Sequence, residues 1–263
     1  MLELYQFEMS HYCEKVRLIL DYKGLAYRKV EVTPGIGQIE LYQMSGQRLV
    51  PVLKDGAEIV ADSTEIVKYL ERKYPQSPVL PTDPQQQALC WLMEEWADES
   101  IGTNSRTTLL NALGRDGDLR KAVLPTSVPG FFKNLVGAVP GELLTVLGTG
   151  VGLGADTVKS AREAMKQNLD CLSKLLANQP YLVGDQPTVA DFAVAGLTMY
   201  VKFPDTPHLD VPDSLRNKGV AGLADHPDYS PFFEWRDRLY QQYRKPLAVD
   251  DSMKTPPTPI EIE

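Results

Sequence analysis

The stretch "LELYQFEMSHYCEKVRLIL", residues 2–20, changes from a strand pattern to a helix pattern and decides the fold of the first part of the chain. Residues 2–7 alternate apolar and polar side chains and include aromatic and branched members, which is typical of a strand. The apolar residues that then recur at helical spacing are Val16, Ile19 and Leu20. Gly24 is suited to end this helix, because glycine readily adopts the left-handed conformation found there. The stretch therefore predicts a strand that leads into a helix.

The pattern continues as a small α/β unit. A second strand pattern follows ("AYRKVEV"), and residues 50–61 form two short strand patterns joined by Asp55-Gly56, a strong hairpin signal. Residues 62–74 then repeat apolar side chains along one helical face behind a capping-box pattern. Residues 1–74 are thus predicted to run βαβ, a connection with a further helix, and ββα.

The rest of the chain is predicted to be helical. The proline-rich segment 77–87 is the best linker, and residues 88–246 carry amphipathic or apolar helix patterns. A glycine- and proline-rich insertion near 101–156 interrupts them. We expect it to pack on the helical domain, with a pocket lid or contact with a membrane surface as alternatives. The acidic, proline-rich tail 247–263 is expected to be disordered.

Composition excludes several classes of function. The net charge of −8 and the absence of a basic stripe make nucleic acid an unexpected partner. Three widely spaced cysteines without a CxxC pair argue against a disulfide framework and a structural zinc site, so no metal is expected. The start has no basic segment followed by an apolar run, and the apolar insertion is too interrupted to span a bilayer. We therefore expect no membrane contact, and the cysteines favour a reducing compartment; the resemblance described next implies the cytoplasm.

Four motifs in order resemble the soluble glutathione S-transferases, with an N-terminal motif like that of the theta and zeta classes. They are "SHYCEKVR", "RLVPVL", "ADSTEIVKYL" and "YLVGDQPTVADFAVAG". The resemblance implies a thioredoxin-like domain over residues 1–76 followed by an all-helical domain. It also implies a homodimeric detoxification enzyme that adds the thiol of glutathione, its co-substrate, to a small apolar electrophile.

The resemblance also assigns residues. Ser10 matches the catalytic serine, six positions before Val16. The positions implied to bind glutathione are Arg48, Val50, Pro51, Asp62 and Ser63. A cis bond is implied at Pro51, and the start of the helix at Ser63 is implied to hold the γ-glutamyl end. Arg48 is as well explained as a solvated surface side chain.

Ser10 is also a good chemical candidate. A free thiol has a pKa near 8.5, and lowering it by two units takes about 2.7 kcal/mol. A hydroxyl that donates to an anion contributes about 1.5–3 kcal/mol, and a helix N-terminus about 0.3–1 kcal/mol. Ser10 at the junction of strand and helix can supply the first and the adjacent amides the second. The alternative is a helix cap without catalytic function, because serine is favoured there.

Cys13 offers a different chemistry. It lines up with the trailing cysteine of a C-x-x-C motif whose leading position is Ser10, so a buried core residue is favoured over a redox role. His11 and Tyr12 are expected to cover the mouth of the site, with a solvated His11 and an inward Tyr12 as alternatives. A glutathione-dependent oxidoreductase that uses Cys13 and a non-catalytic binding protein stay open.

Two further sets of residues are assigned to folding. Thr188 and Asp191 are expected to form a buried capping box at the start of a central helix. Trp91, Trp96 and Trp235 are expected to lie in the core or in an interface.

Overall fold

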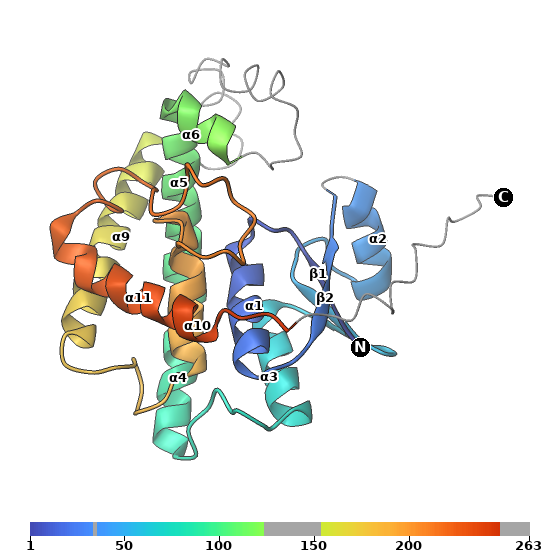
Figure 1. The fold of residues 1–263 in the computed structure, drawn as a ribbon. Helices are drawn as coiled ribbons and strands as arrows, with labels where there is room; N and C mark the ends of the chain where they lie inside the picture. The colour runs from blue at the N-terminus through green and yellow to red at the C-terminus, as the bar shows by residue number, and fades with distance from the viewer. Residues whose placement is uncertain (34–35, 124–153, 248–263) are drawn as a thin grey trace.

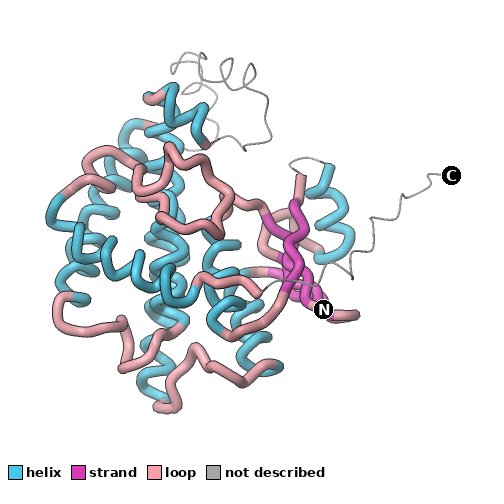
Figure 2. Tube along the Cα trace, in the orientation of Figure 1, coloured by secondary structure: helices cyan, strands magenta, loops and turns pink. Residues whose placement is uncertain are grey.

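The computed structural model describes residues 1–33, 36–123 and 154–247. The predictions for most of the insertion and for the tail after Leu247 lie outside the described residues. In Figure 1 the strands gather at one side of the molecule, and helices make up the other side. Figure 2 shows the same division by secondary structure.

The N-terminal part of the chain contains a four-stranded mixed sheet. Its strands are β1 (Leu2–Gln6), β2 (Tyr27–Glu31), β3 (Val52–Asp55) and β4 (Glu58–Ala61). They are ordered β2-β1-β3-β4, with β1 parallel to β2 and antiparallel to β3, and β3 antiparallel to β4. The predicted hairpin is confirmed, but its two-residue turn is Gly56-Ala57 and not Asp55-Gly56, because Asp55 still pairs with Glu58. Gly56 adopts a positive φ of 62°, which glycine tolerates in such a turn.

Three helices accompany the sheet: α1 (His11–Tyr22), α2 (Ile36–Ser45) and α3 (Ser63–Lys73). α1 and α3 lie between the sheet and the helical part of the molecule, whereas α2 lies on the far side of the sheet (Figure 1). α1 ends as predicted, because Gly24 follows its last turn with a φ of 65°. This arrangement confirms the predicted thioredoxin-like domain.

The second part of the chain is helical, as predicted. Its elements are α4 (Pro84–Trp96), the π-helical turn η1 (Ala97–Gly102), α5 (Thr103–Arg115), α6 (Gly117–Ala122), α9 (Ala155–Leu176), α10 (Val189–Leu197), the short 3-10 turns η2 (Thr198–Tyr200) and η3 (Pro227–Tyr229), and α11 (Ser230–Tyr243). α4 begins inside the predicted linker, because the Asp83 side chain caps it by accepting from the N–H of Gln86. None of the helices in the described ranges has the length and apolar character needed to cross a bilayer.

Helix α10 is the centre of the helical part. All of its residues are buried. The predicted capping box is confirmed, since an oxygen of Asp191 accepts from the N–H and from the hydroxyl of Thr188, both at 2.8 Å. Trp235 is buried in the same core, and Trp91 and Trp96 pack partly buried against it, in line with their expected place.

α10 also sets the position of α1, the helix that follows Ser10. A Cβ atom on Gly196 would lie 2.7 Å from the backbone nitrogen of Lys15, closer than side-chain carbons approach backbone atoms. The backbones of the two helices therefore touch, which only glycine allows here. This contact fixes the start of α1 relative to the helical part.

Candidate functional site

The three predicted binding segments lie at one edge of the sheet. Because β1 and β3 are antiparallel, with Tyr5 opposite Val52, the end of β1 lies beside the start of β3. Because β3 and β4 are antiparallel, with Val52 opposite Ala61, the end of β4 lies at the same edge. The register thus brings the segments after β1, before β3 and after β4 into one row.

Ser10 stands where the chain turns from β1 into α1. It is the N-cap of α1, and its Oγ accepts from the N–H of Cys13 at 3.3 Å. The N–H of Ser10 donates to the carbonyl of Phe7 at 2.8 Å, which closes the turn. The expected cap is therefore present. It uses Oγ as an acceptor, and the hydroxyl proton faces only the buried thiol of Cys13, a weak acceptor from which it can turn to a ligand.

Val50 and Pro51 lie before β3, and the bond between them is cis, as the resemblance implies. Within the described residues, neither the N–H nor the C=O of Val50 makes a hydrogen bond. Val50 is thus able to pair with an extended peptide. Arg48 is exposed, and its guanidinium carbon lies 5.4 Å from the centre of the Tyr42 ring.

Asp62 and Ser63 begin α3. Asp62 has a φ of 78°, and its carboxylate accepts from the N–H groups of Thr64 (2.9 Å) and Glu65 (3.2 Å). Its side chain therefore serves the helix. Ser63 is only 4% exposed, and neither its hydroxyl nor its N–H has a partner among the described residues. Ser63 can donate twice to an anion at this helix start.

The expectation that His11 covers the mouth of the site or is solvated is wrong. The side chain is 3% exposed, and its ring centre lies 4.1 Å from that of Tyr200. Its Nε2 lies 3.1 Å from the carbonyl oxygen of Gly102, so a neutral ring donates from this nitrogen. Burial lowers the pKa of His11 to about 3. The ring is covered because α10 and η1 close over the start of α1.

Tyr12 takes the inward alternative. It is half-buried, and its hydroxyl donates to the carbonyl oxygen of Asp98 at 2.9 Å. The hydroxyl therefore does not lie at the mouth of the site, where it was predicted. It links α1 to η1 instead.

Cys13 is fully buried, as its core interpretation expects. Burial raises the pKa of its thiol, against the positive charge of Arg17 and a hydrogen bond with Ser10. A reactive thiol needs access and a low pKa. Neither condition is met at Cys13.

Sequence reasoning missed a buried charged cluster behind the start of α3. The ammonium group of Lys15 contacts Glu94 at 2.6 Å and Asp98 at 2.7 Å, and Lys15 and Glu94 are at most 1% exposed. The hydroxyl of Thr64 donates to Glu94 at 2.6 Å. Burial raises the pKa of Asp98 to about 6; the nearby Glu94 carboxylate adds to the rise, and Lys15 opposes it. No local pattern joins residues so far apart in the sequence.

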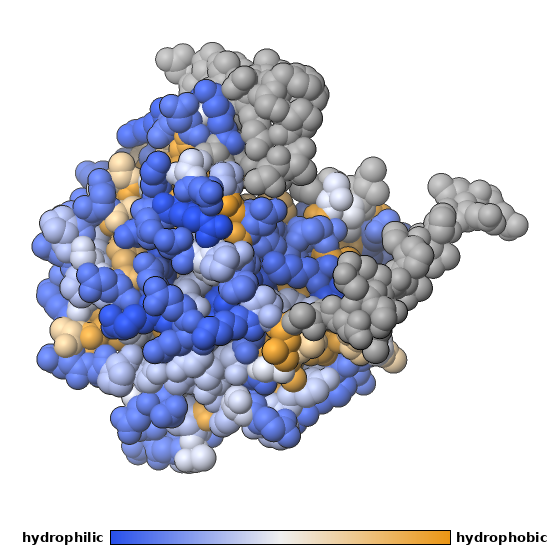
Figure 3. All heavy atoms as spheres, viewed as in Figure 1, coloured by the Kyte–Doolittle hydropathy of each residue, from blue (hydrophilic) through white to orange (hydrophobic). Residues whose placement is uncertain are grey.

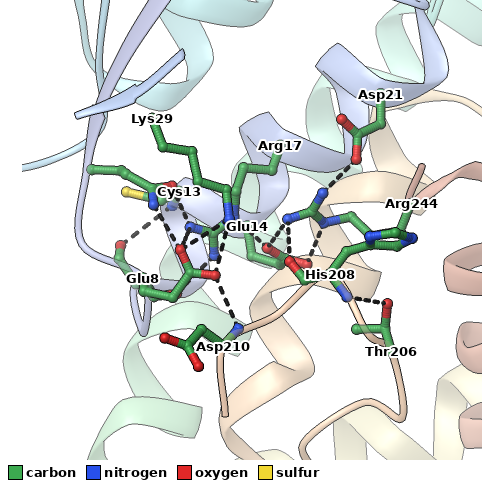
Figure 4. Close-up of polar contacts among 12 residues, drawn as sticks. Glu8, Cys13, Glu14, Arg17, Asp21, Lys29, Thr206, His208, Asp210 and Arg244 are labelled. Atoms are coloured by element: carbon green, nitrogen blue, oxygen red, sulfur yellow. Dashed lines mark hydrogen bonds and ion pairs between the residues drawn. The ribbon is translucent and has the colours of Figure 1, made fainter. Parts of the chain in front are cut away.

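A second missed cluster ties the two parts of the chain together. Arg244, which follows α11, contacts Glu14 at 3.0 Å and also pairs with Asp21 (Figure 4). Arg17 pairs with Glu14, and its guanidinium lies 3.5 Å from Glu8. Glu14, Arg17 and Arg244 have fully buried side chains. The cluster lies directly behind the turn that carries Ser10.

Two family models match the chain in order. The N-terminal domain of glutathione S-transferases matches residues 4–78, and the C-terminal domain of the same family matches residues 134–238. Both halves thus carry the same family signature, in agreement with the mixed sheet and the helical part. The chain belongs to the glutathione S-transferase family.

Relatives and solved structures agree with this family. A zeta-class glutathione S-transferase from Euphorbia esula is 34% identical over 116 residues, 43% of this chain and 52% of the relative. Glutathione S-transferase 1 from Dianthus caryophyllus is 38% identical over 113 residues, 42% of this chain and 51% of the relative. The chain spans about half the length of these curated relatives.

A crystal structure of a glutathione S-transferase from Methylobacterium radiotolerans, in complex with glutathione sulfonate, has the same fold. It matches with a TM-score of 0.59 and 21% identity, over 94% of this chain and 96% of that one.

Proposed function

We propose that the protein is a glutathione transferase in which the Ser10 hydroxyl donates to the thiolate of bound glutathione. The observation that carries the proposal is the geometry of Ser10. Its Oγ accepts from the N–H of Cys13, and its hydroxyl proton can turn from the weakly accepting Cys13 thiol to a ligand at the start of a twelve-residue helix. Donation to an anion and the helix dipole both favour the thiolate. Ser10 acts as a hydrogen-bond donor, and the attacking atom is the sulfur of glutathione.

The rest of the tripeptide has a path along the same edge of the sheet. Val50 offers an unpaired N–H and C=O to the peptide backbone. Ser63 offers its hydroxyl and N–H to the γ-glutamyl carboxylate. Arg48, exposed before the cis bond, is free to reach the glycyl carboxylate. Along the sheet edge, we therefore expect the thiol beside β1, the peptide backbone beside β3 and the γ-glutamyl end beside β4.

The electrophile is proposed to bind beside Ser10, between the two domains. A cavity of about 890 Å³ opens there, and Phe7 and Met9, which precede Ser10, line it. Pro207 and Leu209 line the opposite wall from the helical domain. Its size suits a small organic molecule.

The test is the conjugation rate of Ser10→Ala with a panel of apolar electrophiles. We expect kcat/KM to fall about ten- to a thousandfold, the scale of one lost anion-stabilising donor. Ser10→Thr, which keeps the hydroxyl, should recover part of the loss, and Ser173→Ala on α9 serves as the matched control. An Ser10→Ala variant with the wild-type rate would remove Ser10 from the mechanism.

The oxidoreductase alternative is separated by Cys13→Ser. The fully buried thiol gives the disulfide chemistry no accessible nucleophile, so we expect conjugation to persist in this variant. Glutathione-dependent disulfide reduction that is present in the wild type and lost in Cys13→Ser would instead support the redox function.

The non-catalytic alternative is separated by glutathione binding. A ligand that binds the native state raises its stability, by about 2.7 kcal/mol at a hundred times the dissociation constant. We therefore expect millimolar glutathione to raise the melting temperature of the wild type. No shift and no retention on immobilised glutathione would favour a binding protein with another ligand.

The setting of this activity is proposed from the family. The chain is expected to act in the cytoplasm, in detoxification, as a homodimer. Light scattering coupled to gel filtration tests the oligomeric state, and a monomer at working concentration would contradict the last point.

A further inference from the structure

The cavity beside Ser10 has walls from both domains. Residues from the segment between β1 and α1 and from the end of β2 line one side, and residues from the loop after η2 line the other. Its apolar lining includes Phe7, Met9, Val32, Val123, Leu209 and Val211. On the visible face, hydrophilic residues cover most of the molecule and hydrophobic ones show only in small patches (Figure 3). A hollow with this apolar lining is therefore suited to a ligand with an apolar body.

The positive charges that line the cavity are already paired within the protein. The ammonium group of Lys29 lies 3.1 Å from Glu8. Arg216 lies 3.0 Å from Asp213 and 3.7 Å from Asp205. Neither cation is left without a partner, so the cavity has no unmatched positive charge for an anionic ligand.

The carboxylate of Glu8 is also paired with positive charges of the protein. Besides Lys29, it faces Arg17 and accepts from the backbone N–H of Asp210 at 3.2 Å (Figure 4). Burial opposes its charge, but Arg17 and Lys29 prevail and lower the pKa of Glu8 to about 2. Glu8 thus stays ionised and neutralised, and it holds the two walls together.

Two lining carboxylates are left without a cation. Glu31 accepts from the Gln6 side chain and from the N–H of Glu8, which are neutral donors. The carboxylate of Asp210 points away from Glu8 (Figure 4). In the part of the chain that the structure describes, no Lys, Arg or His lies within salt-bridge distance of either. One unmatched negative charge therefore stands on each wall.

We propose that this cavity binds an apolar organic molecule that carries one positive group, an ammonium or a guanidinium. The apolar lining would cover its body, and Glu31 and Asp210 would attract its charge. A bare metal ion does not fit this arrangement, because no group of three His, Cys, Asp or Glu among the described residues is placed to hold one.

The inference rests on the proposed function only in making this molecule the second substrate, since Phe7, Glu8 and Met9, which precede Ser10, line the cavity. Its test measures binding without glutathione, so it can fail or succeed independently of transferase activity.

The experiment compares three probes of one shape and different charge: naphthylmethylamine, naphthylmethanol and naphthoate. Titration calorimetry at low ionic strength should give the amine a dissociation constant about five- to twentyfold below that of the alcohol, with the acid weakest. The preference for the amine should shrink at high salt. Equal binding of amine and alcohol, tighter binding of the acid, or no binding of any probe would overturn the proposal.

Variants then locate the charge preference. Glu31→Gln and Asp210→Asn should each weaken amine binding about two- to fivefold, and together they should bring it to the level of the alcohol. Binding of the alcohol should not change, which separates charge loss from damage to the fold. Asp170→Asn, on the exposed face of α9, changes the net charge equally and should leave all three constants unaltered. An unchanged amine preference in the double variant would place the amine elsewhere.

Discussion

Polar groups are paired on the inner face of α1 but lack protein partners at the edge of the sheet. On the inner face, Glu14, Arg17 and Arg244 are fully buried, and each charge meets an opposite charge from another part of the chain. At the edge of the sheet, Val50 and Ser63 have backbone groups without partners among the described residues. The two regions are separated by little more than the turn that carries Ser10.

The contrast separates a region that serves stability from the region at which we propose that glutathione binds. A buried charge without a partner is costly, so the matched groups on α1 hold the domains together. Unmatched donors are tolerated at the edge of the sheet because a ligand or water can satisfy them. The following predictions test this division, beginning with the largest expected effect.

Arg244→Met should be the most destabilising of these changes. It removes the cation that contacts Glu14 at 3.0 Å and that also pairs with Asp21, and it leaves both carboxylates buried. Breaking a buried pair in this way costs about 3–5 kcal/mol. Urea unfolding followed by circular dichroism measures the loss in free energy of unfolding.

Arg238→Met is the matched control, because Arg238 lies exposed on the same helix, α11. It should change the free energy of unfolding by no more than about 0.5 kcal/mol. Similar small effects for both variants would mean that the network on α1 does not hold the domains together.

The next largest effect is a pH dependence of the free energy of unfolding, caused by His11 at the start of α1. Burial lowers the pKa of His11 to about 3, from about 6.5 for a solvated histidine side chain. The unfolded chain therefore binds more protons than the native protein between these values. The free energy of unfolding should fall as the pH drops below 6.5, by about 2 kcal/mol between pH 7 and pH 5. His11→Gln should lack this contribution.

The measurement is the difference between the two proteins in how unfolding depends on pH. Taking this difference cancels the carboxylates that both share. His226→Gln, at a half-exposed position, should keep the wild-type slope. A His11→Gln variant with the wild-type slope would show that His11 is protonated in the native state or titrates normally.

The fold was largely predictable because its signals are local. The alternation in β1, the Asp55-Gly56 hairpin signal and the apolar stripe of α9 each depend on neighbours in the sequence. The start of α4 was predicted too late, although the sequence contains a local signal for the correct start. Asp83 followed by Pro84 is a cap and a favoured first helical residue, but the prolines around it favoured a linker.

The candidate site was predictable only in its segments. Motif spacing places Ser10, Val50 and Ser63, and the register of β1, β3 and β4 brings their segments to one edge. What each side chain does there depends on tertiary packing. His11 is buried because η1 closes over the start of α1, and no pattern around residue 11 contains that information.

The buried clusters were not predictable for the same reason. Arg244 and Glu14 are separated by 230 residues, and Lys15 and Glu94 by 79. A single sequence shows such charges only as members of amphipathic helices, whose charged positions are normally solvated. Their burial follows from the contact between α1 and the helical part.

The smallest expected effect concerns Asp62, where the two regions meet. Its carboxylate satisfies two N–H groups of α3, so this position at the edge of the sheet also serves stability. Asp62→Ala should cost about 0.5–2 kcal/mol of unfolding free energy, because it removes the cap and places alanine at a φ of 78°. Asp62→Asn keeps an acceptor oxygen and tolerates the positive φ, so its cost should stay below about 0.5 kcal/mol. Equal losses in both variants would assign the effect to the charge of Asp62, and then this part of the edge would depend on ionic contacts as the inner face of α1 does.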